Sequence, residues 1–117
     1  MKTELVQLRT FYAAPGFALL AQDREPLGCV AFRSLGNHDG EIRRLFVSPN
    51  QRAAGLGRRL VARLIEQARA DGFQRLFLNT LPTMTHAIAL YESLGFTSTD
   101  CYAGDPTEGI LYFSLAI

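Results

Sequence analysis

The chain has 117 residues, enough for one domain with a single hydrophobic core. Hydrophobic residues make up 48% and charged residues 20%, and the formal net charge of +1 gives no strong field for binding nucleic acid or an anionic membrane. No apolar run reaches the roughly 20 residues of a membrane span, and the first residues lack the apolar stretch of a secretory signal. We therefore expect a single cytoplasmic domain over residues 1–117.

The two cysteines, Cys29 and Cys101, are too few and too far apart for a zinc site or a redox CxxC pair. The sequence therefore predicts no metal centre.

The first half of the chain predicts a short helix followed by an antiparallel sheet. Leu5, Leu8 and Phe11 recur at helical spacing, so residues 4–12 are expected to form a helix. Three strands should follow between short turns, at residues 17–22, 27–35 and 41–47. Short connections between successive strands favour an antiparallel meander.

The segment Leu56–Ala70 predicts a long amphipathic helix. One face carries the apolar side chains, which are those of Leu60, Val61, Leu64, Ile65 and Ala68. Gly72 is placed to end this helix in a left-handed conformation. Residues 74–80 predict a strand that pairs in parallel with residues 41–47, because a helix of this length joins the two.

The last third predicts a second helix at residues 82–94, ended by Gly95, and two closing strands at residues 96–99 and 110–115. This order fits an α+β fold in αβα layers. Its mixed sheet begins as an antiparallel meander and has a parallel central pair.

The loop of residues 47–57 follows a strand and opens a helix. Gly55 and Gly57 let the backbone turn sharply and approach a ligand, and the first helical turn presents unpaired N–H groups. Together these groups could bind an anion such as a pyrophosphate. A P-loop is excluded because arginine follows Gly57, and Leu60 excludes a dinucleotide fingerprint. The glycines alone favour a turn that merely starts a helix over an anion site.

The wider context is more specific. Arg52-x-x-Gly55-x-Gly57, preceded by a strand that ends in Leu-Phe-Val-Ser-Pro, resembles motif A of the GNAT acetyltransferases. Asn79-Thr80, followed by residues 89–96, looks like the family's motif B. The resemblance covers about residues 17–113, with the two motifs in the right order and at a fitting separation.

The resemblance implies a GNAT-like fold with acetyl-CoA as co-substrate. The main-chain N–H groups that would hold the pyrophosphate are those of Ala54, Gly55, Leu56, Gly57 and Arg58. Arg52 would help to neutralise it, unless it is only an exposed loop arginine. In the family, the preceding strand is bulged and splays from its parallel neighbour, so Phe46 and Val47 would pair with the pantetheine arm. Asn79 would face that gap, or would simply end a strand.

The resemblance also places Tyr91 to donate a proton to the leaving thiolate, a role that suits a phenol with a pKa near 10. The alternative is that Tyr91 only packs under the sheet. Glu41 corresponds to a glutamate that some family members, notably histone-acetylating ones, carry ahead of the glycine loop. It could take the proton of the amine through a water, or could be an exposed residue at the start of a strand.

A full-length family member begins with a further strand and helix, so this chain is expected to start in the family's second helix. The edge at residues 17–22 would then be open, and a homodimer could cover it. On the acceptor side, Tyr102 and Asp105 could bind an amine, although their segment could also be a long irregular loop without a functional role.

The leading interpretation is an N-acetyltransferase that acetylates the primary amine of a small molecule by direct attack. The alternatives are a peptide or protein acceptor, a non-catalytic CoA-binding module, and a structural or interaction domain that binds no nucleotide.

Overall fold

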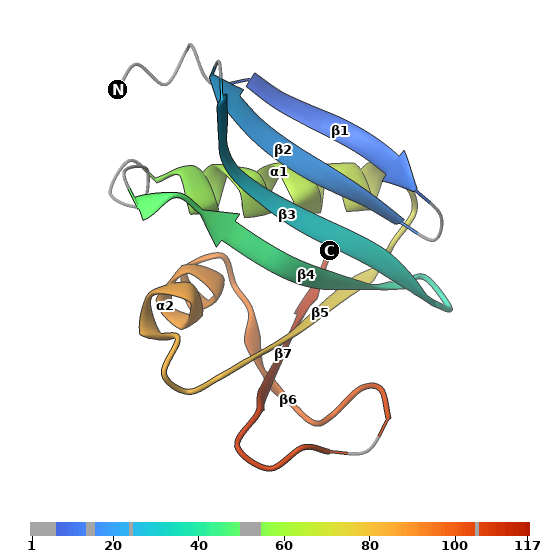
Figure 1. Cartoon of the computed structure of the whole chain (residues 1–117). Helices are drawn as coiled ribbons and strands as arrows, with labels where there is room; N and C mark the ends of the chain where they lie inside the picture. The colour runs from blue at the N-terminus through green and yellow to red at the C-terminus, as the bar shows by residue number, and fades with distance from the viewer. Residues whose placement is uncertain (1–6, 14–15, 24, 50–54, 105) are drawn as a thin grey trace.

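The computed structural model describes residues 7–13, 16–23, 25–49, 55–104 and 106–117. Within these ranges the chain forms one seven-stranded sheet, in the order β1-β2-β3-β4-β5-β7-β6, with two helices (Figure 1). No helix in the same ranges is long and apolar enough to cross a membrane. The elements in chain order are β1 (Gln7–Ala13), β2 (Gly16–Asp23), β3 (Glu25–Gly36), β4 (Asp39–Val47), α1 (Leu56–Ala70), β5 (Arg75–Thr80), α2 (Thr85–Ser93), β6 (Thr97–Thr99) and β7 (Leu111–Ala116).

The predicted mixed sheet is confirmed. Strands β2, β3 and β4 form the antiparallel meander, and β4 pairs with β5 in parallel through the α1 crossover. The two closing strands are also present, with β7 lying between β5 and β6. The second helix begins later than predicted, at Thr85, after a turn in which the Met84 N–H donates to the Leu81 carbonyl.

The helix predicted at residues 4–12 is wrong for its described part, because Gln7–Ala13 is the strand β1. This strand pairs with β2 along its whole length, from Gln7 opposite Gln22 to Ala13 opposite Gly16. Two physical reasons favour the strand. The segment contains the β-favouring Thr10, Phe11 and Tyr12, and pairing satisfies the main-chain groups of β2. The edge predicted to be open at residues 17–22 is therefore covered, which removes the reason given for a homodimer.

Helix α1 has the bounds predicted from its apolar face. It packs on β2, β3 and β4 and lies behind them in Figure 1, whereas neither of the two helices in the described ranges lies in front of β1 to β4. The side chains of Leu60, Val61 and Leu64 have no exposed surface. Burying each such side chain stabilises the fold by about 1.5–3 kcal/mol. Beyond the helix, Gly72 has a φ of 92°, the left-handed conformation predicted for it.

The parallel pair β4–β5 is closed at one end and open at the other. Its pairing runs only from Asp39 opposite Arg75 to Glu41 opposite Phe77. At the closed end, the Arg75 guanidinium donates two hydrogen bonds of 3.0 Å to the Asp39 carboxylate. Beyond Glu41 the two strands separate, so the main chain of β4 up to Val47 no longer pairs with β5.

A bulge in β4 accompanies this separation. Ala31 of β3 lies opposite Arg43, but Cys29 lies opposite Phe46, so β4 has one extra residue in between. Arg44, at the bulge, has a φ of 53°, a left-handed conformation that is uncommon outside glycine. The predicted bulged and splayed strand is thus present, and it opens the sheet at its centre.

Candidate active site

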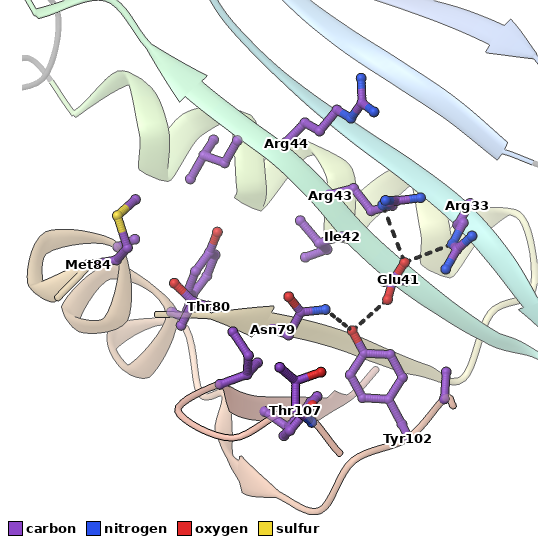
Figure 2. A pocket seen from close by; sticks show the side chains of 16 residues that line it. Arg33, Glu41, Ile42, Arg43, Arg44, Asn79, Thr80, Met84, Tyr102 and Thr107 are labelled. Carbon is purple, nitrogen blue, oxygen red and sulfur yellow. Dashed lines mark hydrogen bonds and ion pairs between the residues drawn. The ribbon is translucent and has the colours of Figure 1, made fainter. Parts of the chain in front are cut away.

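A cavity of about 620 Å³ lies where β4 and β5 separate (Figure 2). Its walls come from β3, β4, β5, α2, β7 and the segment between β6 and β7. The cavity brings together four side chains that the sequence singled out, namely Glu41, Asn79, Tyr91 and Tyr102. Residues far apart in the chain therefore meet at the split in the sheet.

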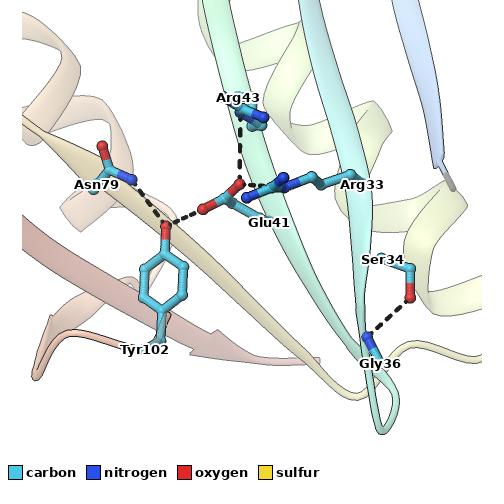
Figure 3. Close-up of polar contacts among 7 residues, drawn as sticks. All are labelled: Arg33, Ser34, Gly36, Glu41, Arg43, Asn79 and Tyr102. Atoms are coloured by element: carbon cyan, nitrogen blue, oxygen red, sulfur yellow. Dashed lines mark hydrogen bonds and ion pairs between the residues drawn. The ribbon is translucent and has the colours of Figure 1, made fainter. Parts of the chain in front are cut away.

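Glu41 is the centre of a polar network in this cavity (Figure 3). Arg33 lies directly opposite Glu41 in the β3–β4 ladder, and its Nε donates to Glu41 Oε1 at 2.7 Å. The Tyr102 hydroxyl donates to Glu41 Oε2 at 2.6 Å, and Asn79 Nδ2 donates to the Tyr102 oxygen at 3.1 Å. Arg43 Nε lies 3.6 Å from Glu41 Oε1 and adds an ion pair. Both carboxylate oxygens are thus engaged.

The burial of Glu41 explains why it needs these partners. Its side chain is only 6% exposed, so the alternative of an exposed strand residue is wrong. An unpaired carboxylate at such a position would lose several kcal/mol of hydration, which the arginines and the phenol offset. Burial, and then the hydrogen bond to Glu41, raise the pKa of Tyr102. Tyr102 therefore stays a neutral donor that ties the segment after β6 to β4.

Tyr91 lies on α2 and lines the same cavity. The residue is 6% exposed, and its ring packs edge-on against Phe96 at 5.7 Å between centroids. Burial raises its pKa to about 12, so the phenol is fully protonated at neutral pH. Its hydroxyl makes no hydrogen bond to any described residue. Tyr91 thus presents an O–H group with no fixed protein partner among these residues.

The first turn of α1 has the features of an anion site. Gly55 precedes the helix in a left-handed conformation, with a φ of 76°, and the first turn contains no acidic residue. A Cβ atom on Gly57 would lie 3.4 Å from Leu90 and 3.5 Å from Val47, which is ordinary contact. The fold itself therefore does not require glycine at position 57. The side chain of Arg58 donates to Ser93 Oγ at 2.6 Å and so links α1 to α2.

Of the remaining predicted residues, those that the structure describes do not line this cavity. Phe46 is 54% exposed near the end of β4, and Val47 is half-buried beside it. Leu56 is buried in the core, so its side chain contacts protein. Arg52, Ala54 and Asp105 lie outside the described residues.

The sequence interpretation missed Arg33 as a partner of Glu41. A partial signal was available, because the strands at residues 27–35 and 41–47 form a hairpin and are therefore neighbours. Counting outward from the predicted turn at residues 36–40 places Arg33 opposite Arg43, however, and it is the register shift between Ser34 and Gly36 that brings Arg33 opposite Glu41. The place of Tyr102 on the other carboxylate oxygen had no comparable signal, since an irregular segment carries it.

Comparisons with known proteins agree with this architecture. A profile of the Acetyltransferase (GNAT) family matches residues 2–96. An uncharacterized N-acetyltransferase of Schizosaccharomyces pombe is 35% identical over 116 residues, covering 96% of this chain and 71% of that protein. The crystal structure of a Klebsiella pneumoniae protein assigned as an acyl-CoA N-acyltransferase has 28% identity and a TM-score of 0.83, covering 87% of this chain and 72% of that one. A Bacillus subtilis acetyltransferase solved in complex with CoA has a TM-score of 0.79, and the match covers 96% of this chain and 99% of that one. Because its sequence identity is only 17%, this likeness shows the fold alone.

Proposed function

The chain belongs to the acetyltransferase (GNAT) family, and from this premise we propose that it transfers the acetyl group of acetyl-CoA to the primary amine of a small molecule. The observation that supports a small-molecule acceptor is the cavity at the point where β4 and β5 separate. Its volume of about 620 Å³ lies within the range of roughly 300–1,000 Å³ typical of small-ligand pockets. A peptide acceptor is the alternative, and an open surface groove would suit it better.

For the donor, we propose that the diphosphate of acetyl-CoA binds at the first turn of α1. The main-chain N–H groups of Gly55, Leu56, Gly57 and Arg58 would donate to it, supported by the positive end of the helix dipole. Arg52 and Ala54 belong to the same proposal from the sequence motif. The pantetheine arm would then lie along β4 beside Phe46 and Val47, as an added strand.

For the chemistry, we propose direct attack within the cavity. The nitrogen of the neutral amine bonds to the acetyl carbonyl carbon, and the carbon–sulfur bond then breaks. Tyr91 donates its phenolic proton to the departing thiolate sulfur, and the excess proton of the amine leaves through a water. Asn79, which lies on β5 beyond the last residue paired with β4, would orient the acetylated end of the donor. The free phenol of Tyr91 and its neutral state at pH 7 support this role.

Glu41 is our candidate for the base that receives the amine's proton. Glu41→Gln is expected to lower kcat/KM at neutral pH by about tenfold or more, and to move the rising limb of the pH–rate profile to higher pH. The reason is that the variant must rely on solvent to deprotonate the amine. Steady-state rates between pH 6 and 10 measure this, with Glu66→Gln on the exposed side of α1 as the matched control. A lower rate with an unmoved profile would make Glu41 a positioning residue for Arg33 and Tyr102.

Two assays test the function itself. Acetyl-CoA should raise the Tm of the protein, because a ligand that binds only the folded state stabilises it. Release of free CoA thiol is then measured with a panel of small amines and of peptides. Release with small amines supports the proposal, and release with peptides alone favours the peptide acceptor. Binding without release indicates a CoA-binding module, and the absence of any Tm shift indicates a structural domain.

A cytoplasmic location belongs to the same proposal, since the reaction consumes acetyl-CoA. A homodimer would have to use an edge other than β2, because β1 covers that strand. Sedimentation at micromolar concentration tests the dimer, and a stable monomer would exclude it.

A further inference from the structure

Three arginines lie together on the wall of the candidate active site. Arg33 comes from β3, while Arg43 and Arg44 come from β4 at its bulge. All three line the cavity that holds Tyr91 and Asn79 (Figure 2), and all three also line a second hollow of about 330 Å³ beside Phe17 and Phe32. We call Arg33, Arg43 and Arg44 the arginine cluster.

Glu41 contacts two of these arginines through their Nε atoms, so that their terminal Nη nitrogens can bind a ligand. Arg33 approaches the carboxylate through Nε at 2.7 Å, and Arg43 approaches it through Nε at 3.6 Å. Their terminal Nη nitrogens make no hydrogen bond to a described residue, and the two side chains are 44% and 45% exposed. Paired guanidinium N–H groups of this kind bind carboxylates in a bidentate manner. Glu41 therefore orients the two guanidinium groups without occupying them fully.

The charge of the site is not balanced. Among the described residues that line the cavity, Glu41 is the only acidic one, against the three guanidinium groups of the arginine cluster. Arg44 has no ion-pair partner in the described part of the chain. A concave site with excess charge of one sign attracts a ligand group of the opposite sign. The cluster also lies on the same wall as Glu41, toward which the acceptor amine is directed in the proposed function.

We propose that the acceptor is an amine whose own molecule carries a carboxylate, as an amino acid does, and that the arginine cluster binds this carboxylate. The proposal rests on the proposed function, because it assigns the acceptor of the same reaction. A bound carboxylate explains why basic side chains lie at a site that binds an amine. The arginine cluster would repel a cationic amine that carries no anionic group.

The experiment compares matched acceptors. Free thiol release is measured with a panel of amino acids, each with its carboxamide and its decarboxylated amine. For the best substrate, kcat/KM for the amino acid is expected to exceed that for its carboxamide by about tenfold or more. The reason is that the neutral carboxamide cannot form the charge-assisted hydrogen bonds that the carboxylate would make with the arginine cluster. In Arg43→Gln this ratio is expected to fall toward one. Arg69→Gln, on the exposed last turn of α1, should keep the wild-type ratio.

A second readout does not need turnover. Calorimetry should show the N-acetylated acid binding to the CoA-loaded protein at least about tenfold more tightly than its amide, with the difference lost in Arg43→Gln. Equal kcat/KM for acids, amides and simple amines would overturn the carboxylate proposal while leaving acetyltransfer intact. A tenfold weaker affinity of Arg43→Gln for acetyl-CoA would also overturn it, because the cluster would then belong to the donor. If acetyl-CoA neither binds nor reacts, the proposed function fails and this proposal fails with it.

Discussion

Tyr91→Phe is expected to lower kcat by more than about tenfold, with little change in KM for acetyl-CoA. The substitution removes only the hydroxyl, which makes no hydrogen bond to the described part of the chain. The ring should keep its edge-on contact with Phe96, so the Tm should stay within a few degrees of the wild type. A loss of kcat without a loss of stability would therefore report the missing proton donor. Steady-state kinetics and thermal unfolding on the same preparation measure both.

The matched control is Tyr12→Phe on strand β1, where the residue is 66% exposed and does not line the cavity. Its kcat should equal that of the wild type. The raised pKa of Tyr91, about 12, adds a pH criterion. A phenol with this pKa is lost as an acid only when the pH rises toward 12, so it cannot cause a decline in rate between pH 7 and 10. An unchanged kcat in Tyr91→Phe would remove this residue from the mechanism.

Gly57→Ala is expected to raise KM for acetyl-CoA by about tenfold or more while leaving the fold intact. The added methyl group would meet Leu90 and Val47 at ordinary contact distances. Alanine is also favoured over glycine in a helix by up to about 1 kcal/mol, so the Tm should be unchanged or higher. A diphosphate at the first turn of α1, in contrast, would be pushed away from the amides that bind it. Calorimetry with acetyl-CoA and thermal unfolding together measure the two effects.

Gly72→Ala, at the other end of α1, is the matched control. Gly72 has a φ of 92° and open space around the position of a Cβ atom. Alanine there should destabilise the fold by about 1 kcal/mol through backbone strain, without affecting the affinity for acetyl-CoA. The opposite behaviour of the two glycines separates a ligand-binding role from a structural one. An unchanged KM in Gly57→Ala would contradict the proposed diphosphate site.

Local patterns were sufficient where one physical signal dominated. The apolar face of α1 predicted its bounds, because a single helix covers three strands and must bury one continuous stripe. The parallel pairing of β4 and β5 followed from the length of their connection. The bulge and the split came from the family resemblance instead, since neither strand shows them in its own sequence.

The N-terminal segment shows where local patterns fail. Leu5, Leu8 and Phe11 fit a helical spacing, but Gln7–Ala13 pairs with β2 as a strand. The main-chain groups of β2 require partners, and this requirement comes from the tertiary structure. In the candidate site, Glu41, Asn79, Tyr91 and Tyr102 could be selected from the sequence. The hydrogen bond between Tyr102 and Glu41 could not be predicted, because it joins an irregular segment to a strand across the split.

Calorimetric titration with acetyl-CoA and with S-acetylpantetheine tests the central claim most directly. We predict one molecule of acetyl-CoA per chain with micromolar affinity, and at least about 100-fold weaker binding of the pantetheine fragment, because it lacks the diphosphate that α1 would bind. The absence of any heat with acetyl-CoA, or equal affinity for the two compounds, would contradict the account.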